Sequence, residues 1–234
     1  LLNKRKISIM RLPKKGSLLR EIPIIVVSAL VVAVIIKTFF VHFFFVPSGS
    51  MQNTLGIGDR IAVNKFSAMF SDIRRGEVVV FKDPANWLGS APPSSGNAVA
   101  REFKRALVDV GVLPDPATQY LVKRTIGVGG DHVVCCDTRG RLQVNGISIT
   151  ENYLFPGNAP SDSKFDITVP KGFLWVMGDH RGASADSRFH TDDIHKGFVP
   201  LSDVVGRAEF VVWPLNKLKF LSVSHDLSRV AVRK

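Results

Sequence analysis

The feature that most constrains this chain is an uncharged apolar run over residues 22–36. Fifteen residues fall short of the roughly 20 that cross the hydrocarbon core of a bilayer, but extending the run through Lys37 to Val41 reaches that length. Lys37 would then lie near the far interface, where its aliphatic stem stays in lipid while its ammonium group reaches water. No second run of this length occurs. The sequence therefore predicts one transmembrane helix, which we assign to a retained anchor over residues 22–46.

The charges that precede the run predict its orientation. Seven Lys and Arg residues stand against Glu21 there, so +6 of the net charge of +11 lies in the first 21 residues. The positive-inside rule keeps such a segment in the cytoplasm and sends the following chain across the membrane. The rest of the chain has no basic stripe with interleaved aromatic residues, which argues against nucleic acid as a partner. We expect a single-pass plasma-membrane protein with residues 1–21 in the cytoplasm and the folded part on the extracytoplasmic face.

A cleavable signal peptide is the alternative interpretation of the same segment. A basic head, an apolar stretch and a small-x-small motif at Ser48-Gly49-Ser50 fit that pattern. However, the bulky residues 43–45 lie between the apolar stretch and the motif, and the stretch exceeds the roughly 7–15 residues of a signal-peptide core. These features favour a retained anchor.

The chain past residue 55 is typical of a mostly β domain, because short β-branched segments alternate with Gly, Pro and Asp. We assign this domain to residues 47–214. One stretch, residues 87–119, breaks the pattern and predicts a loop followed by an amphipathic helix that ends at Gly111. Residues 215–234 form a basic C-terminal tail without an evident role. The expected strands span residues 60–64, 77–81, 120–126, 132–136, 142–144, 166–169, 173–177 and 204–212.

The two cysteines, Cys135 and Cys136, are adjacent. Neighbours in a strand point to opposite faces, so we expect two unpaired thiols, with a vicinal disulfide left open as the alternative. Neither the cysteines nor the six histidines show the spacing of a metal site, and we expect no metal or other cofactor.

A lysine in an unusual setting is the first candidate for chemistry. Lys123 lies within the apolar segment YLVKRTI, and strand alternation puts it on the face opposite Val122 and Arg124. On an inward face it would be desolvated, which disfavours its charged form. A general base near neutral pH requires the pKa to fall by about 2–3 units from about 10.4. An exposed lysine on an edge strand is the simpler interpretation of this segment taken alone.

A second candidate is the loop MGDHRGASADSR over residues 177–188, which is dense in polar side chains. Asp186 and Arg188 are well spaced for an ion pair, and Ser184 could contact a base. The alternative is a solvated turn with local ion pairs, which is common in proteins.

Three segments together resemble a known family. PSGSM at residues 47–51, the Lys-Arg pair followed by G-x-x-G-D, and GD-x-R-x-x-S-x-D-S-R occur in this order in type I signal peptidases, which are membrane-anchored serine–lysine proteases. The resemblance covers most of the chain from the anchor to about residue 214. It implies an antiparallel β-sheet catalytic domain, with residues 87–119 as a helical insertion. Asn53 and Gly129 stand where many members have Pro, and His180 stands where Asn is commoner, so these departures concern loop geometry.

The resemblance also implies roles for individual residues. Ser50 is the implied nucleophile, Lys123 its neutral general base, and Ser48 shares the oxyanion hole with the backbone N–H of Ser50. Ser184 is implied to orient Lys123, and Arg124 to be structural. The other implied residues are those that brace the site, Asp179, Arg181, Asp186 and Arg188, and those that line shallow substrate pockets, Val46, Leu55 and Val122.

The activity that the resemblance implies is removal of N-terminal signal peptides from exported preproteins after a small-x-small motif, through an acyl-enzyme. The implied partners are preprotein signal peptides, the phospholipid membrane and the protein-export translocon. Two rivals remain: a soluble self-cleaving repressor-type protease, against which the anchor argues, and a membrane-tethered β domain that only binds partners.

Overall fold

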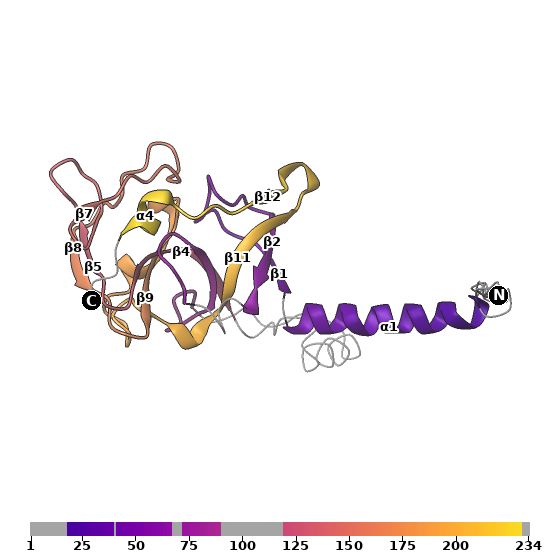
Figure 1. Cartoon of the computed structure of the whole chain (residues 1–234). Coiled ribbons are helices and arrows are strands. Elements are labelled where there is room, and N and C mark those ends of the chain that lie inside the picture. The colour runs from indigo at the N-terminus through magenta and orange to yellow at the C-terminus, as the bar shows by residue number, and fades with distance from the viewer. Residues whose placement is uncertain (1–17, 40, 67–71, 90–118, 231–234) are drawn as a thin grey trace, which may run out of the picture.

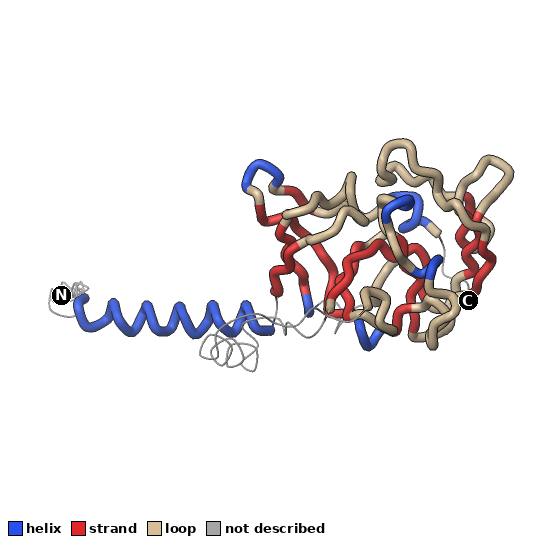
Figure 2. The backbone as a smooth tube through the Cα atoms, turned by 180° about the vertical axis from the view of Figure 1, so that it is seen from behind, coloured by secondary structure: helices blue, strands red, loops and turns tan. Residues whose placement is uncertain are grey.

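The computed structural model describes residues 18–39, 41–66, 72–89 and 119–230. The predicted insertion lies almost entirely outside these residues, as does most of the basic N-terminal segment. One helix extends away from a domain built mainly of strands, as Figures 1 and 2 show from opposite sides. The helices are α1 Leu18–Phe39 and α4 His225–Arg229, with short 3-10 turns η1 Arg181–Ala183, η2 Ser187–Phe189, η3 Leu201–Asp203 and η4 Leu215–Lys217. The strands are β1 Val41–Phe45, β2 Arg60–Asn64, β3 Val78–Lys82, β4 Tyr120–Val128, β5 His132–Cys135, β6 Gln143–Val144, β7 Ile147–Ser148, β8 Phe165–Thr168, β9 Phe173–Met177, β10 Val199–Pro200, β11 Val204–Trp213 and β12 Lys219–Phe220.

The strands form two sheets, and the paired strands of the described chain are all antiparallel. The larger sheet has the order β1-β2-β11-β3-β4-β9-β10, with β12 added beside β11. The smaller sheet has the order β7-β6-β5-β8. The prediction of a mostly β, antiparallel domain is confirmed. In the larger sheet β4 is an interior strand, which determines the environment of its side chains.

Eight strands were predicted from sequence, and all eight are present. The bounds of β2 and β9 agree fully, and those of β3, β4, β5, β6, β8 and β11 differ by one or two residues. The sequence did not predict β7, β10 and β12, which have two residues each, or β1. A two-residue strand carries no alternation pattern, so its existence depends on partners far away in the chain.

The predicted anchor extends too far toward the C-terminus. Residues 41–46 were assigned to the anchor, but Val41–Phe45 form β1 and pair with β2, with Phe44 opposite Ile61. Phe44 and Val46 are buried, whereas Phe43 and Phe45 are exposed. This alternation is the period of a half-buried strand, and a continuous run of phenylalanines obscures it in the sequence.

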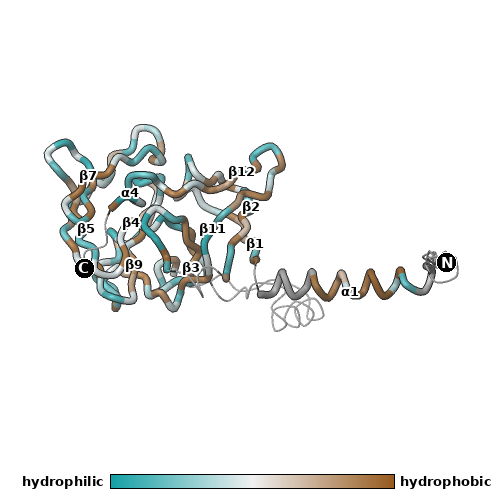
Figure 3. The backbone as a smooth tube through the Cα atoms, in the orientation of Figure 1, coloured by the Kyte–Doolittle hydropathy of each residue, from teal (hydrophilic) through white to brown (hydrophobic). Residues whose placement is uncertain are grey.

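The helix α1 begins at Leu18 and includes Pro23 in its early part. In the part of α1 that Figure 3 colours by hydropathy, most residues are apolar. Across the part of the chain that the structure describes, no helix has the length and apolar character required to cross a membrane.

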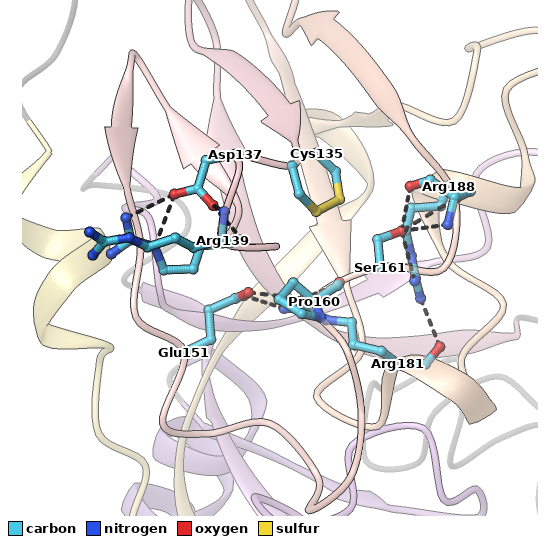
Figure 4. The surroundings of a disulfide bond; sticks show 11 residues. Cys135, Asp137, Arg139, Glu151, Pro160, Ser161, Arg181 and Arg188 are labelled. Atoms are coloured by element: carbon cyan, nitrogen blue, oxygen red, sulfur yellow. Dashed lines mark hydrogen bonds and ion pairs between the residues drawn. A yellow bond between two sulfur atoms is a disulfide. The ribbon is translucent and has the colours of Figure 1, made fainter.

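The expectation of two unpaired thiols is wrong, because Cys135 and Cys136 form a disulfide bond (Figure 4). The expectation of unpaired thiols rested on strand alternation. Strand β5 ends at Cys135, so Cys136 lies beyond the strand and the alternation rule does not apply to the pair. Cys135 is buried in the core cluster that contains Trp175 and Met177.

The C-terminal segment is part of the folded domain rather than a tail that begins at residue 215. Strand β12 pairs with β11, and Leu227 and Val230 are buried in the same core cluster as Met177. The Arg75 guanidinium, itself paired with Asp131, donates a hydrogen bond to the Val230 carbonyl at 2.7 Å. The predicted domain boundary at residue 214 is therefore too early.

Candidate active site

The turn that follows β1 carries Ser50. Backbone hydrogen bonds from the Gln52 N–H to the Gly49 carbonyl at 3.0 Å and from the Leu55 N–H to the Met51 carbonyl at 2.7 Å close successive turns. Met51 and Leu55 are each only 1% exposed, so two apolar side chains hold the turn against the core. Ser50 lies between these anchors and is itself buried. We call residues 49–55 the nucleophile turn.

Lys123 lies in the middle of β4, and its Nζ donates a hydrogen bond to Ser50 Oγ at 2.8 Å. The lysine is 4% exposed. Strand β3 pairs with β4 on one side, with Val79 opposite Lys123, and β9 pairs with it on the other side from Arg124 onward. Lys123 therefore faces inward, and the alternative of an exposed edge-strand lysine is wrong.

The environment of Lys123 favours its neutral form. Burial lowers the pKa of its ammonium group from 10.5 to about 8, against the opposing effect of the Asp186 and Asp179 carboxylates, which raise it. At neutral pH a far larger fraction of Lys123 is therefore neutral than of a lysine in water. A neutral amine at hydrogen-bond distance from a hydroxyl can accept its proton, which is the geometry that general-base catalysis requires.

The other two predicted serines occupy different positions. Ser48 is exposed, and its Oγ lies 3.4 Å from Ser50 Oγ. Ser184 is buried, and its Oγ has no hydrogen-bond partner among the residues that the structure describes. A hydrogen bond from Ser184 Oγ to Lys123, through which Ser184 could orient the lysine, is therefore not formed in this structure.

Gly178 allows the loop after β9 to approach the nucleophile turn closely. A Cβ atom on Gly178 would lie 2.5 Å from the Ser50 carbonyl oxygen and 2.6 Å from Ser184 Cβ, closer than real Cβ atoms approach other heavy atoms. The neighbouring His180 N–H donates to the same Ser50 carbonyl at 3.0 Å. The loop after β9 and the nucleophile turn are therefore in direct backbone contact.

The carboxylate of Asp179 connects β4 with the nucleophile turn. Arg124 donates to both of its oxygens, from Nε at 2.8 Å and from Nη2 at 2.6 Å, and Thr54 Oγ1 also donates to it. The Arg124 guanidinium lies 4.1 Å over the ring centre of Tyr153. Because Asp179 is fully buried, its charge requires these partners.

Hydrogen bonds and ion pairs join residues of the loop over residues 177–188 to one another and to a loop that is distant in the sequence. The predicted ion pair between Asp186 and Arg188 is confirmed, with distances of 2.8 and 3.0 Å. Asp186 also accepts from the Gly178 N–H at 2.9 Å, while Arg181 donates to the Gly178 carbonyl at 2.9 Å. The far side of Arg181 pairs with Glu151 and reaches the Pro160 carbonyl, as Figure 4 shows. The bracing residues predicted from sequence therefore form one buried network.

The predicted pocket residues lie together. Val46 and Leu55 belong to one core cluster, and Val122 packs against it. Val46 and Leu55 are almost fully buried, whereas Val122 is half-buried and reaches the surface beside Lys123. A separate cavity of about 410 Å³ borders Thr54, Arg124 and Tyr153 but neither Ser50 nor Lys123, so it lies behind the bracing network and not at the reactive pair.

Sequence reasoning did not identify four residues of this network. Thr54, Glu151 and Tyr153 contact predicted site residues, and Gln52 contacts His180 beside them. None of the four belongs to a recognisable motif. Glu151 and Tyr153 come from the loop after β7. Only the three-dimensional fold brings them near Arg181 and Arg124.

Comparisons with known proteins identify the family of the chain. The model of the signal peptidase family, peptidase S26, matches residues 19–213. Signal peptidase I of Mycobacterium tuberculosis is 40% identical over 222 residues, which cover 86% of this chain and 75% of that protein. A probable signal peptidase I of Mycobacterium leprae is 41% identical, with 86% and 78% covered, and signal peptidase I of Leptolyngbya laminosa is 33% identical, with 88% and 85% covered. A solved signal peptidase I from Enterococcus faecalis is 24% identical, with a TM-score of 0.37, 58% of this chain covered and 97% of that chain.

A buried lysine amine at hydrogen-bond distance from a serine hydroxyl is the arrangement that a serine peptidase of the Ser–Lys type requires. The chain belongs to the signal peptidase family, peptidase S26, which confirms the resemblance noted from the sequence. Peptidases of this family use a serine–lysine dyad.

Proposed function

We propose that this chain is an endopeptidase that removes N-terminal signal peptides from exported preproteins, with Ser50 as nucleophile and Lys123 as general base. The observation that carries the assignment of residues is the 2.8 Å hydrogen bond between Lys123 Nζ and Ser50 Oγ in a buried site. Family membership supports the reaction class.

The proposed reaction has two covalent steps. Ser50 Oγ attacks the scissile carbonyl carbon while neutral Lys123 accepts the hydroxyl proton. The lysine then gives this proton to the departing amine, which leaves an ester between Ser50 and the signal peptide. A water molecule attacks the ester, Lys123 accepts the proton of that water, and Ser50 Oγ recovers a proton as the signal peptide departs.

The proposed oxyanion donors are the Ser50 N–H and the Ser48 hydroxyl. Donors aimed at the oxygen that becomes negative are often the largest single contribution to catalysis. The exposed position of Ser48, with its Oγ 3.4 Å from Ser50 Oγ, supports this role because a substrate carbonyl can approach from solvent.

The proposed substrate-binding mode is an extended strand beside the first half of β4. Among the described residues, β9 pairs with β4 only from Arg124 onward, whereas β3 pairs with β4 over its first five residues. A substrate backbone added on the β9 side of Tyr120–Lys123 would form main-chain hydrogen bonds and place alternate side chains toward the domain. Val122, backed by Val46 and Leu55, would leave room only for small side chains, which is the proposed reason for the small-x-small preference.

The proposed test of the catalytic assignment uses the full chain in detergent and a secretory precursor as substrate. Ser50→Ala is expected to lower the rate of precursor cleavage by on the order of 10³-fold or more, because no other group can form the ester. Ser48→Ala is expected to cost about 10²-fold, the size of one lost oxyanion donor. Gel analysis of precursor and product measures both rates.

Two controls make this test decisive. Circular dichroism and thermal unfolding establish that each variant is folded, and mass spectrometry of the product locates the cut. Cleavage by Ser50→Ala at the wild-type rate would overturn the assignment of the nucleophile. A membrane-tethered binding domain would cleave nothing as wild type, and a repressor-type protease would cleave itself in preference to the precursor.

We also propose that the apolar run anchors the domain in the plasma membrane, with its N-terminus in the cytoplasm and the catalytic domain outside. In support, eight large apolar side chains between Ile22 and Val32 are more than half exposed, which is unfavourable in water. The basic residues before the run support the orientation. The bilayer is a proposed partner on the same grounds, and the translocon is a proposed partner because of the family to which the chain belongs.

The anchor is tested by alkaline carbonate extraction of membranes from cells that make the full chain. Wild-type protein is expected to stay in the membrane pellet, and the Val27→Asp/Leu30→Asp double variant is expected to shift into the supernatant, because a buried carboxylate costs roughly 3 kcal/mol at the centre of a membrane helix. The matched variant Ile147→Asp, on an exposed position of β7, is expected to stay in the pellet. Release of the wild-type protein by carbonate would contradict the anchor.

A further inference from the structure

The nucleophile turn folds one side chain back onto the loop that follows β9. Gln52 Oε1 lies 2.9 Å from Nδ1 of His180, at hydrogen-bond distance. With this oxygen facing the ring, Nδ1 carries the hydrogen and the carboxamide accepts it. The mechanism proposed above uses neither side chain.

The carboxamide of Gln52 also lies against Gly49. A Cβ atom on Gly49 would be 2.9 Å from Gln52 Oε1 and 3.1 Å from Gln52 Cδ, so the side chain is packed over the glycine backbone. The backbone N–H of Gln52 donates to the Gly49 carbonyl at 3.0 Å. The position of this side chain therefore restricts the peptide group between Gly49 and Ser50, which carries the Ser50 N–H.

His180 is itself held from three sides. Its ring stacks on the Phe155 ring, with 4.0 Å between centres and 16° between planes. Its backbone N–H donates to the Ser50 carbonyl at 3.0 Å, and the Phe155 N–H donates to the carbonyl of the preceding Asp179 at 3.0 Å. The histidine is thus tied to the bracing network through Asp179 and to the nucleophile through its own backbone.

These contacts act on both peptide groups of Ser50, the one that carries its N–H and the one that carries its carbonyl. The His180 N–H holds its carbonyl, and the Gln52 side chain, held by the His180 ring, restricts the peptide that carries its N–H. Oxyanion donors act only when they point at the developing charge, and a misplacement of about 1 Å can cost 10²-fold in rate.

We propose that Gln52 and His180 are a positioning pair that orients the Ser50 N–H toward the oxyanion of the transition state. The proposal rests on the proposed function, because it assigns Ser50 the role of nucleophile. Neither residue touches substrate. Their effect passes through the Gly49–Ser50 peptide.

The experiment compares two substitutions that each remove one partner of the hydrogen bond while keeping shape. His180→Phe keeps an aromatic ring to stack on Phe155 and keeps the backbone N–H, but it removes Nδ1. Gln52→Met keeps the length of the side chain and removes the carboxamide. Each is made in the full chain, in detergent, and the double variant is made beside them. His132→Phe, at a half-buried position of β5 in the smaller sheet, is the matched control.

Each single variant is expected to lower kcat about tenfold with KM within twofold of wild type and the unfolding midpoint unchanged. The double variant is expected to be no slower than the slower single variant, because one hydrogen bond is removed in all three. A peptide aldehyde, which adds to Ser50 Oγ and forms a hemiacetal oxygen at the oxyanion position, is expected to bind each single variant about tenfold more weakly. His132→Phe is expected to match the wild type in kcat, KM and aldehyde binding.

Wild-type kcat in either single variant overturns the positioning pair, as do losses that multiply in the double variant. A loss of kcat with a lowered unfolding midpoint and unchanged aldehyde affinity would show a structural role instead and also overturns it. If Ser50→Ala abolishes cleavage while these variants are fully active, only this inference fails. If Ser50→Ala cleaves normally, the proposed function itself fails.

Discussion

Gly178→Ala is expected to lower precursor cleavage by at least about 10²-fold and to lower the unfolding midpoint. An added methyl group at this position would lie 2.5 Å from the Ser50 carbonyl oxygen and 2.6 Å from Ser184 Cβ, and the first of these atoms belongs to the backbone. The contact can be relieved only by moving the nucleophile turn away from the loop that follows β9. Overpacking of this kind costs about 1–3 kcal/mol, and the displacement moves Ser50 relative to Lys123.

The same loop offers a matched control for this substitution. A Cβ atom on Gly182 would have no neighbour closer than 3.9 Å, from the Asn158 side chain. Gly182→Ala is therefore expected to leave the cleavage rate and the unfolding midpoint near the wild-type values. Cleavage kinetics and thermal unfolding of both variants provide the comparison. Equal behaviour of the two variants would show that the close approach at Gly178 does not hold the site together.

Local patterns predicted the strands well but not their environment. Alternation and turn residues identified β4 correctly, yet the segment around Lys123 favoured an exposed edge strand when taken alone. Its burial depends on β3 and β9, which pair on either side of β4 and come from segments about 45 and 55 residues away in the chain. Only the resemblance, which combined three distant motifs, predicted that Lys123 faces Ser50.

The remaining differences have local physical causes. The phenylalanines of β1 continue the apolar run of α1, so hydropathy alone does not mark where the strand begins, and only pairing with β2 separates them. The contacts of Gln52, Thr54 and Glu151 involve ordinary polar residues in turns, which in sequence look like solvated loops. Asn53 has a backbone φ of 82°, which proline cannot adopt, so the departure from the family pattern at this position goes with a different turn conformation.

Lys123→Met is expected to abolish catalysis while it stabilises the fold at neutral pH. Methionine fills a similar volume but cannot accept the Ser50 proton, so precursor cleavage is expected to fall by about 10³-fold or more. In the wild type, kcat/KM is expected to rise with pH and to level above about pH 8, as the buried lysine loses its proton. The control Lys171→Met, on an exposed turn, is expected to retain both the rate and this pH profile.

The lowered pKa of Lys123 makes the free energy of unfolding of the wild type depend on pH. Below about pH 8 the lysine is charged in both the folded and the unfolded chain, so the cost of burying an ammonium group is fully present. Between about pH 8 and 10.5 only the unfolded chain keeps the proton, so the free energy of unfolding rises with pH. The lowering of the pKa corresponds to a rise of about 3 kcal/mol in the free energy of unfolding across this pH range.

Lys123→Met removes this cost, so its advantage in the free energy of unfolding is expected to be largest near pH 7 and to shrink by about 3 kcal/mol toward pH 10.5. Urea unfolding of both proteins at several pH values measures the difference. If the advantage of the variant over the wild type in the free energy of unfolding grew between pH 7 and pH 10, the result would contradict a desolvated lysine. A fold that accepts a destabilising buried amine beside Ser50 has a physical reason to keep it, because the burial that costs stability is what makes the amine a base.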